Sequence, residues 1–305
     1  MPADHSSVVP IRAIAVEDDL DLEEDSLRPN GLDVSIVVAC LNSARSLRRC
    51  LDSVLCQTVG AAELIVIDGG SADGTVDILK SYGDRIVYWT SEPDRGIADA
   101  WNKGIAHAHG EWLYFLGADD FLWSPEVLGM LAKRLARVPS NQSVVFAAAN
   151  VVAPGGRVIR TLGTSWDRRE FLRVGMNVPH QGVLQRRILF DQLGRFDESF
   201  RIAIDYEFLL RYLKDREPHS MPDIVVAGQE AGGLSTSDRN TLKVLREFAR
   251  ARTKNGLPNS SPAFFARVGL ALLKAAIYGI LGEGAGRRVT DFCRRLAGRE
   301  VLWTE

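Results

Sequence analysis

Four short apolar runs, rich in β-branched and aromatic residues, recur between residues 34 and 116 and are separated by polar turns and helix-like segments. The runs are 34–39 (VSIVVA), 63–68 (ELIVID), 86–90 (IVYWT) and 112–116 (WLYFL). An apolar run without polar alternation is typical of a strand that is buried on both faces. Strands that alternate with helices predict an α/β fold with a Rossmann-type, mostly parallel sheet and helices on both of its faces.

The segment after the first run shows the helical pattern. Asn42 and Ser43 have side chains suited to a helix N-cap, and Leu47, Leu51 and Val54 then recur on one helical face. We therefore expect a helix that begins directly after residue 43 and packs its apolar face on the sheet.

Composition and charge exclude some classes of function. The chain has 305 residues and a formal net charge of −2. Near-neutral charge argues against a dedicated nucleic-acid-binding protein, which usually has a basic excess. The first thirty residues lack the basic start and apolar core of a signal peptide, so we expect a cytoplasmic protein. Cys40, Cys50, Cys56 and Cys293 show no metal-ligand or CxxC spacing and are expected to be free, buried thiols.

The two ends of the chain differ from its middle. Residues 1–32 are acidic and poor in aromatic residues, which predicts a disordered tail. At the other end, residues 256–262 (GLPNSSP) form a breaker-rich linker. Residues 256–305 are predicted to form a C-terminal extension of amphipathic, basic helices.

This extension contains the most hydrophobic helix-like stretch, 263–281. Arg267 and Lys274 interrupt it and share one narrow face, because they are two helical turns apart. A wide apolar face beside basic residues predicts peripheral membrane contact through 263–298, at the inner face of the plasma membrane. A helix docked on its own domain, or in a homodimer interface, explains the same pattern, so both interpretations stay open.

The predicted strands end in small and polar residues. In an open α/β sheet, ligands bind beyond the carboxyl ends of the strands. Asp68 ends the second run, and the adjacent Asp119 and Asp120 follow the fourth. Neighbouring carboxylates repel each other unless a cation lies between them and a phosphate, which predicts a divalent cation, Mn²⁺ or Mg²⁺. The first strand is followed by neither GxGxxG nor a P-loop motif, which argues against a dinucleotide or P-loop site.

Several segments, taken together and in this order, resemble those of the inverting family-two glycosyltransferases. They are VSIVVACLN, VIDGGSADGT, EPDRGIADAWNKGIAHAHGEWLYFLGADD and the later HQG and IDYEFLLR. That family has a GT-A nucleotide-sugar-binding fold and commonly serves bacterial polysaccharide or O-antigen biosynthesis. The similarity implies a GT-A domain over 33–255, with a nucleotide-sugar-binding half at 33–122 and an acceptor half at 123–255.

The resemblance also implies roles for individual residues. Asp205 falls where the family has its catalytic base, and Asp119 and Asp120 match its metal-binding acidic motif. His180 and Gln181 match a segment that contacts the acceptor or the diphosphate. The residues implied in nucleotide-sugar binding are Ala39, Leu41, Asn42, Asp68, Arg95, Gly96, Asp99, Asn102, Lys103 and Asp119.

Two departures from the family pattern bear on catalysis. Gly117 stands where many members have a further aspartate, and Ile204 stands where glutamate usually precedes the base. Glu207 is therefore a second candidate for the base. The departures keep open a non-catalytic, GT-A-like nucleotide-sugar-binding or scaffold subunit, and an acidic pair on an α/β sheet also suits a sugar nucleotidyltransferase.

The prediction that results is a metal-dependent inverting glycosyltransferase of the hexosyl- or N-acetylhexosaminyl-transferring type. The donor is a nucleotide sugar, with a UDP-sugar favoured, and the acceptor is a saccharide or a lipid-linked sugar in cell-surface polysaccharide synthesis. A divalent cation stabilises the diphosphate leaving group, and a carboxylate base activates the acceptor hydroxyl.

Overall fold

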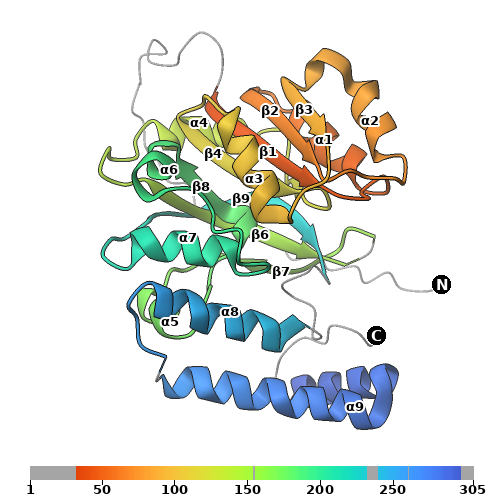
Figure 1. The fold of residues 1–305 in the computed structure, drawn as a ribbon, viewed down its shortest axis with the longest axis vertical. Helices are drawn as coiled ribbons and strands as arrows, with labels where there is room; N and C mark the ends of the chain where they lie inside the picture. Colours follow the sequence, from red (N-terminus) through yellow and green to blue (C-terminus); the bar gives the residue numbers. More distant parts are fainter. Residues whose placement is uncertain (1–31, 154, 232–239, 260, 297–305) are drawn as a thin grey trace, which may run out of the picture.

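The computed structural model describes residues 32–153, 155–231, 240–259 and 261–296 (Figure 1). The tail predicted over 1–32 therefore lies outside the described residues, except for its last residue. Within the described residues, one sheet contains nine strands in the order β3-β2-β1-β4-β8-β6-β9-β5, and β7 pairs with β6. The predicted α/β class is confirmed.

The elements have the following bounds. The strands are β1 (Leu32–Cys40), β2 (Ala61–Asp68), β3 (Tyr88–Ser91), β4 (Trp112–Gly117), β5 (Phe121–Leu122), β6 (Val144–Val152), β7 (Val158–Leu162), β8 (Val183–Arg186) and β9 (His219–Glu230). The α-helices are α1 (Leu47–Leu55), α2 (Thr75–Tyr82), α3 (Ile97–Ala106), α4 (Val127–Leu135), α5 (Arg168–Arg173), α6 (Ile188–Leu193), α7 (Ile204–Leu213), α8 (Thr241–Lys254) and α9 (Pro262–Leu296). Short 3₁₀ helices are η2 (Gly83–Arg85) and η3 (His180–Gly182).

The sheet is parallel in its first half and mixed in its second. β1 pairs in parallel with β2 and with β4, and β2 pairs in parallel with β3. β8 then runs antiparallel to both β4 and β6, whereas β6 and β9 are parallel. The four parallel strands all end at one edge of the sheet, and their carboxyl ends position the loops described below.

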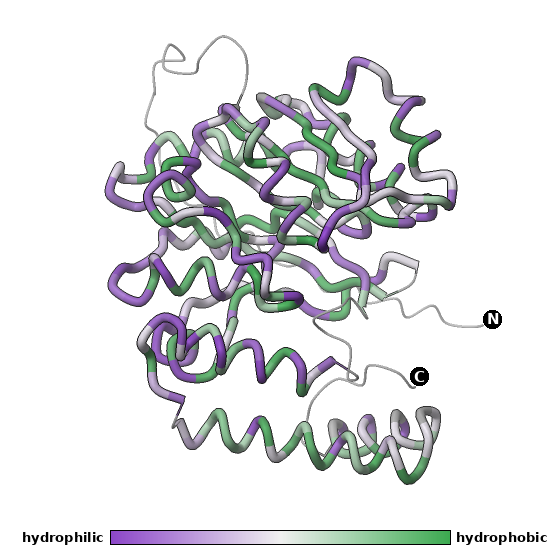
Figure 2. Tube along the Cα trace, viewed as in Figure 1, coloured by the Kyte–Doolittle hydropathy of each residue, from purple (hydrophilic) through white to green (hydrophobic). Residues whose placement is uncertain are grey.

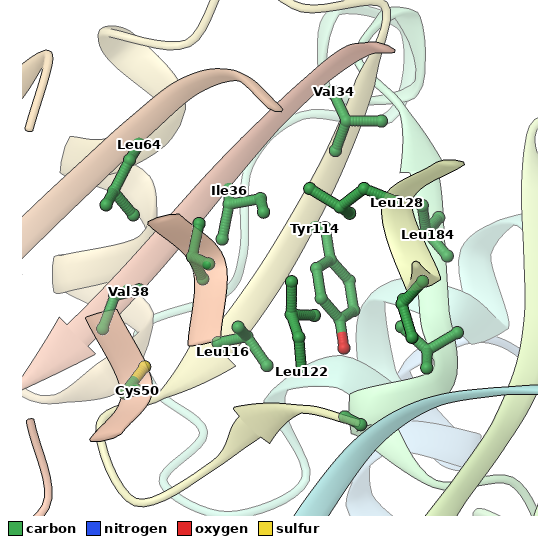
Figure 3. Close-up of a cluster of buried hydrophobic side chains, with 14 of the residues drawn as sticks. Val34, Ile36, Val38, Cys50, Leu64, Tyr114, Leu116, Leu122, Leu128 and Leu184 are labelled. Carbon is green, nitrogen blue, oxygen red and sulfur yellow. The ribbon is translucent and has the colours of Figure 1, made fainter. Parts of the chain in front are cut away.

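Alternate residues of the central strands enter two separate cores, because side chains along a strand point to opposite faces. Ile36 lies in register between Leu64 and Tyr114, and all three belong to the core beneath α1, α2 and α4 (Figure 3). Val37 and Phe115 belong to the core beneath α3, α6 and α7. The prediction that helices cover both faces is confirmed.

Two local predictions are wrong. α1 begins at Leu47 rather than directly after Ser43, because the chain first makes a turn in which the Ser43 carbonyl accepts from the Leu47 N–H. The Asn42 side chain bonds to a neighbouring loop instead of capping the helix. All four cysteines are free, as predicted, but Cys56 and Cys293 are exposed rather than buried.

The C-terminal helices form successive layers away from the sheet. α8 packs on α7, and α9 packs on α8 and is the outermost element (Figure 1). α9 is interrupted at Gly282, whose φ of 75° is not helical. Tyr278 and Thr290, one on each side of this break, are 3.3 Å apart through their hydroxyl oxygens, so the second half of α9 folds back along the first.

Candidate functional site

The loops after β1 and β2 are joined at the carboxyl edge of the sheet. Asn42 has a positive φ of 50°, a conformation that asparagine adopts more readily than most residues. Its N–H donates to Ser71 Oγ at 2.6 Å, and its Oδ1 accepts from the Ala72 N–H at 3.0 Å. Ala39 is half-buried and Leu41 is 56% exposed. Ala39, Leu41 and Asn42 therefore lie at an accessible strand end, as their predicted role requires.

Asp68, a buried residue at the same edge, holds the ends of β1 and β3 and the loop after β2 together through hydrogen bonds. It is fully buried, and its carboxylate accepts hydrogen bonds from Cys40, Gly70, Ser71 and Ser91. Burial by itself raises the pKa of Asp68, but the hydrogen bonds, led by those from Ser71 and Ser91, outweigh it and hold the pKa below its usual range. Because protein donors occupy both oxygens, contact of Asp68 with a nucleotide base requires one of these bonds to open, and that contact stays a prediction.

Asp94, which the sequence did not single out as a site residue, lies beside this edge. A Cβ on Gly69 would be 2.6 Å from Asp94 Oδ2, so only glycine allows this close approach. The other carboxylate oxygen of Asp94 accepts from the Gly96 N–H at 2.8 Å and fixes the turn that begins α3. The signal for Asp94 was its place in the polar segment directly after the third strand, next to Arg95.

Asp119 and Asp120 converge over Gly117, at the end of β4. A Cβ at Gly117 would lie 2.8 Å from Oδ1 of Asp119 and 3.1 Å from Oδ2 of Asp120. The two carboxylates thus fill the space of a side chain at 117, which explains why glycine stands there. Oxygen ligands completed by phosphates suit Mg²⁺ or Mn²⁺. The pair fits the predicted cation only with ligands from a substrate, since the described residues include no cluster of three or more His, Cys, Asp or Glu that could hold a metal.

The two carboxylates have different surroundings. Asp119 is exposed, whereas Asp120 is 5% exposed and accepts hydrogen bonds from the Gly117 N–H at 3.2 Å and from Gln181 Nε2 at 3.1 Å. Burial, and then the charge of Asp119, raise the pKa of Asp120 to about 7. A cation at the pair would remove this repulsion, so the electrostatics of the two carboxylates favour cation binding.

His180 and Gln181, in η3, link the acidic pair to Asp205. Gln181 bonds Asp120 through its side chain, and its carbonyl accepts from Tyr114 Oη at 2.6 Å. The His180 Nδ1 lies 3.3 Å from Oδ2 of Asp205. Asp120, Gln181, His180 and Asp205 therefore form a continuous row from the end of β4 to the start of α7.

Trp101 of α3 supports the imidazole in this row. Its ring stacks on that of His180, with centroids 4.7 Å apart and planes inclined by 19°. Among the described residues, neither Trp101 Nε1 nor either ring nitrogen of His180 has a hydrogen-bond partner, although all three atoms are buried. Unpaired buried polar atoms are uncommon and costly, so these three are not explained by core packing alone. Nothing in the spacing of Trp101 distinguishes it from a core aromatic residue.

Asp205 is held in place from α8. The carboxylate of Glu247 accepts hydrogen bonds from the N–H groups of Arg201, Ile202 and Ala203 at 2.8–2.9 Å. These three residues lead directly into α7, and Asp205 lies in its first turn. Glu247 is thus a supporting residue that sequence analysis missed, because it lies on a separate helix with no motif of its own.

Glu207 is not an alternative base, and that expectation is wrong. Two residues along a helix correspond to a rotation of about 200°, so Glu207 points away from Asp205. It is fully buried, its carboxylate is 2.8 Å from Lys254 Nζ, and it pairs with Arg211. Its negative charge is therefore neutralised by Lys254 and Arg211.

Four predicted donor-binding residues lie on the other side of α3. They line a pocket of about 530 Å³, together with side chains of β3 and of residues 195–198. The four residues are Arg95, Asp99, Asn102 and Lys103. Trp101 points almost the opposite way from Asp99, again because two helical residues are about 200° apart. Trp101, which stacks on His180, and the pocket-lining Asp99 therefore lie on different faces of α3.

The polar groups of the pocket are paired with one another. Arg95 Nη2 is 2.7 Å from Glu198, and Lys103 Nζ is 2.8 Å from Glu92. The amide of Asn102 both donates to and accepts from the backbone of residue 196 at 3.0 Å. In the described part of the chain, the structure brings none of these side chains into contact with the acidic pair, so their contact with the donor stays a prediction.

Gly96 lies at the junction of the two regions. It precedes α3 with a φ of 117°, and a Cβ there would be 2.9 Å from Nη1 of Arg201. That guanidinium donates to the carbonyl of Arg95. The start of α3 is thereby tied to the segment that leads into α7.

Comparison with known sequences identifies relatives. The family model described as "Glycosyl transferase family 2" matches residues 35–190. A "PGL/p-HBAD biosynthesis glycosyltransferase" of Mycobacterium bovis (strain BCG / Pasteur 1173P2) is 33% identical over 225 residues, which cover 69% of this chain and 83% of the relative. An uncharacterized glycosyltransferase of Mycobacterium tuberculosis (strain CDC 1551 / Oshkosh) is 36% identical over 188 residues, 61% of this chain and 70% of the relative.

Solved structures share the fold. TarS 1-349 from S. aureus, in complex with UDP-GlcNAc, aligns with a TM-score of 0.57 at 17% identity, over 77% of this chain and 72% of that one. The mannosyltransferase PcManGT from Pyrobaculum calidifontis, in complex with GDP-Man and Mn²⁺, aligns with a TM-score of 0.57 at 19% identity, over 89% of this chain and 81% of that one. At these identities the likeness concerns the fold, and it confirms the predicted GT-A-type architecture.

Proposed function

The chain belongs to glycosyl transferase family 2, and we propose that it is a cation-dependent inverting enzyme that transfers a sugar from a nucleotide sugar to an acceptor hydroxyl. The observation that carries the proposal is the row from Asp120 through Gln181 and His180 to Asp205. In this row, two adjacent residues of η3 lie between an acidic pair suited to a diphosphate and a carboxylate suited to a hydroxyl.

Asp119 and Asp120 are the residues that would hold the cation, and the bound cation would act as a Lewis acid toward the diphosphate. The donor would lie over the ends of β1 and β2, where Leu41 and Asn42 are exposed. Two solved structures of similar fold, one in complex with UDP-GlcNAc and the other with GDP-Man and Mn²⁺, support a nucleotide-sugar donor and a divalent cation. We favour a UDP-sugar that carries a hexosyl or N-acetylhexosaminyl group.

Asp205 is assigned as the general base. Its side chain is 16% exposed, its Oδ2 lies 3.3 Å from His180 Nδ1, and its Oδ1 accepts from the Tyr206 N–H at 2.7 Å. The remaining lone pairs can accept the proton of an acceptor hydroxyl. Asp205 takes the proton of the acceptor hydroxyl as the acceptor oxygen bonds to the anomeric carbon. The bond from that carbon to the diphosphate breaks, and the nucleoside diphosphate leaves. A single displacement of this kind inverts the anomeric configuration.

The acceptor would be a saccharide or a lipid-linked sugar in the synthesis of a cell-surface polysaccharide. We place the reaction in the cytoplasm, because exposed free thiols at Cys56 and Cys293 suit a reducing compartment.

Transfer and donor hydrolysis with a panel of nucleotide sugars, with EDTA and after addition of Mn²⁺, test the proposal. We expect EDTA to abolish turnover and Mn²⁺ to restore it. Asp205→Asn should lower kcat by roughly 10²–10⁴-fold, as expected for loss of a general base, with donor binding unchanged by calorimetry. Asp191→Asn, at an exposed position, is the matched control and should behave as the wild type. Full activity in EDTA or in Asp205→Asn contradicts the mechanism, and donor binding without turnover in the wild type supports the non-catalytic alternative.

A further inference from the structure

The outermost helix has an apolar face that nothing in the described structure covers. The length and composition of Pro262–Gly282 would allow this segment to cross a membrane. Only 11% of the residues in its most apolar stretch are buried in the protein. The hydrophobic positions continue along most of this half of α9 (Figure 2). The exposed large side chains are Phe265, Leu270, Leu272, Leu273, Ile280 and Leu281, each between 50% and 82% exposed.

The opposite side of the same helix is docked on the protein. Phe264 and Ala271 are buried against Leu245 of α8, with Val268 packed beside them. The guanidinium of Arg252 lies 4.3 Å from the centre of the Phe264 ring. These contacts fix which side of α9 faces the domain.

Helical geometry separates the two faces. Successive residues of a helix are rotated by about 100° around its axis. When the direction of Phe264 is taken as 0°, Val268 and Ala271 point within about 40° of that direction. The six exposed apolar residues fall between about 80° and 260°, so they occupy the half of the helix that points away from the domain. Arg267 and Lys274 fall at about 280–300°, on one border between the two faces.

We propose that this face of α9 rests in the plane of an anionic lipid bilayer. A broad apolar arc bordered by cations is the pattern of a helix that lies at a membrane surface. The second half of α9 adds charge of the right sign, since 286–295 contains four arginines, of which Arg288 is exposed. Phe292, in the same half, is 62% exposed. Anionic lipid matches both the apolar face and the exposed Arg288, while Arg267 at the border stays paired with Glu170 of α5.

The docked face argues for an in-plane helix rather than a spanning one. A spanning α9 would have to leave α8 and expose Phe264 and Ala271 to lipid. It would also have to break the ion pair between Arg267 and Glu170 of α5. Resting on the surface requires neither change, because α9 is already the outermost layer of the molecule (Figure 1).

Vesicle co-sedimentation of the full chain tests the proposal. The wild type should pellet with vesicles of phosphatidylcholine and phosphatidylglycerol, and much less with phosphatidylcholine alone. Leu270→Glu combined with Leu273→Glu should weaken binding by roughly tenfold or more, because two apolar side chains leave the bilayer. Arg288→Gln should weaken it by roughly fivefold, the value of one basic residue near an anionic surface. Val87→Glu, at a 61% exposed apolar position far along the chain from α9, is the matched control and should bind as the wild type.

Cys293 offers a second readout at a native position. It is exposed in the second half of α9, and replacing the other exposed cysteine, Cys56→Ser, leaves it as the accessible thiol in the described part of the chain. A polarity-sensitive dye on Cys293 should shift its emission to the blue with anionic vesicles. The shift should disappear in the Leu270→Glu, Leu273→Glu variant, whose melting curve serves as the folding control.

Four results would overturn the proposal. The first two are absence of wild-type binding to anionic vesicles and unchanged binding by the double glutamate variant. The third is a dimer in lipid-free sedimentation velocity that this variant dissociates, which would assign the face to a second copy of the chain. The fourth is retention of wild-type protein in membranes after alkaline carbonate extraction, which would indicate a spanning helix. Vesicle co-sedimentation measures no sugar transfer. The membrane proposal can therefore fail while the transferase assay succeeds, and the transferase assay can fail while vesicle binding is observed.

Discussion

The carboxylates of Asp119 and Asp120 occupy the space that a side chain at position 117 would need. Gly117→Ala should therefore push the carboxylates apart and weaken Mn²⁺ binding by roughly tenfold or more, as other disturbances near metal ligands do. The methyl group projects into an accessible site rather than into the core, so the fold should persist. Calorimetric titration with Mn²⁺ and UDP measures the effect.

Gly60→Ala is the matched control for this substitution. A Cβ at Gly60 meets no atom within 4 Å, so this variant should bind Mn²⁺ as the wild type does. Equal Mn²⁺ affinity in Gly117→Ala would show that the acidic pair does not hold the cation.

Asp120 links the site to the pH dependence of stability. Its pKa is raised from 3.8 to about 7 in the folded protein. Between these values the unfolded chain has lost the proton and the folded chain keeps it, so metal-free protein loses stability as pH rises through this window. Asp120→Asn cannot ionise, and in EDTA its free energy of unfolding should exceed that of the wild type by about 4 kcal/mol at pH 8.

The difference between variant and wild type should nearly vanish toward pH 3, below the unfolded pKa of 3.8, where Asp120 is protonated in both states. Urea denaturation in EDTA across this range measures it. A constant difference at every pH would show that the buried carboxyl is not the cause.

At the scale of elements, the position of Asp205, the proposed base, depends on a contact between α7 and α8. Glu247 of α8 accepts three backbone hydrogen bonds from the residues that lead into α7. Glu247→Ala should lower the free energy of unfolding by about 2 kcal/mol, since charge-assisted hydrogen bonds are lost. It should also lower kcat and leave KM for the donor nearly unchanged. Asp205 loses its position, whereas the loops after β1 and β2, where the donor is proposed to bind, are untouched.

Lys243→Ala, at an exposed position one turn earlier on α8, is the control and should change neither quantity. A loss of stability without a selective loss of kcat would give Glu247 a purely structural role. Urea denaturation and steady-state kinetics distinguish the two outcomes.

α3 shows why a motif does not define a single site. Arg95, Asp99 and Lys103 belong to one continuous segment with Trp101, and the resemblance implies a role near the donor for the three charged residues. The helical rotation sends Trp101 toward His180 and the charged residues toward the outer pocket. Spacing along a helix determines which face a residue occupies, but not what the neighbouring elements place against that face.

At the scale of the whole molecule, the row from Asp120 to Asp205 connects the strand ends of the first half to the helices of the second. UDP with Mn²⁺ should therefore stabilise the entire domain. At a concentration 100 times Kd the gain is about 2.7 kcal/mol. For a chain of this size this gain corresponds to a rise in Tm of about 5 °C.

Differential scanning fluorimetry with UDP and Mn²⁺, with either alone, and with EDTA measures this coupling. We expect EDTA to remove the shift and Mn²⁺ alone to produce little of it. A full shift with UDP in EDTA would show that the nucleotide binds without the acidic pair.

The sequence by itself determined the α/β class, the positions of the first four strands and the convergence of Asp68, Asp119 and Asp120 at one edge. These depend on local patterns, since apolar periodicity sets which face a residue occupies and parallel strands end together. Only the tertiary structure decided that both carboxylate oxygens of Asp68 accept hydrogen bonds from protein donors, and that Glu207 is buried in ion pairs.

Contacts between distant segments belong wholly to the tertiary structure. Trp101 and His180 stack although they lie far apart in the chain, and Glu247 holds the start of α7 from another helix. α9 docks on α8 by one face and leaves the other face exposed. Docking on the domain and contact with a membrane surface, the two interpretations of its apolar sequence, therefore do not exclude each other. A sequence states which side chains are available, but what each contacts depends on packing between elements, which no local pattern encodes.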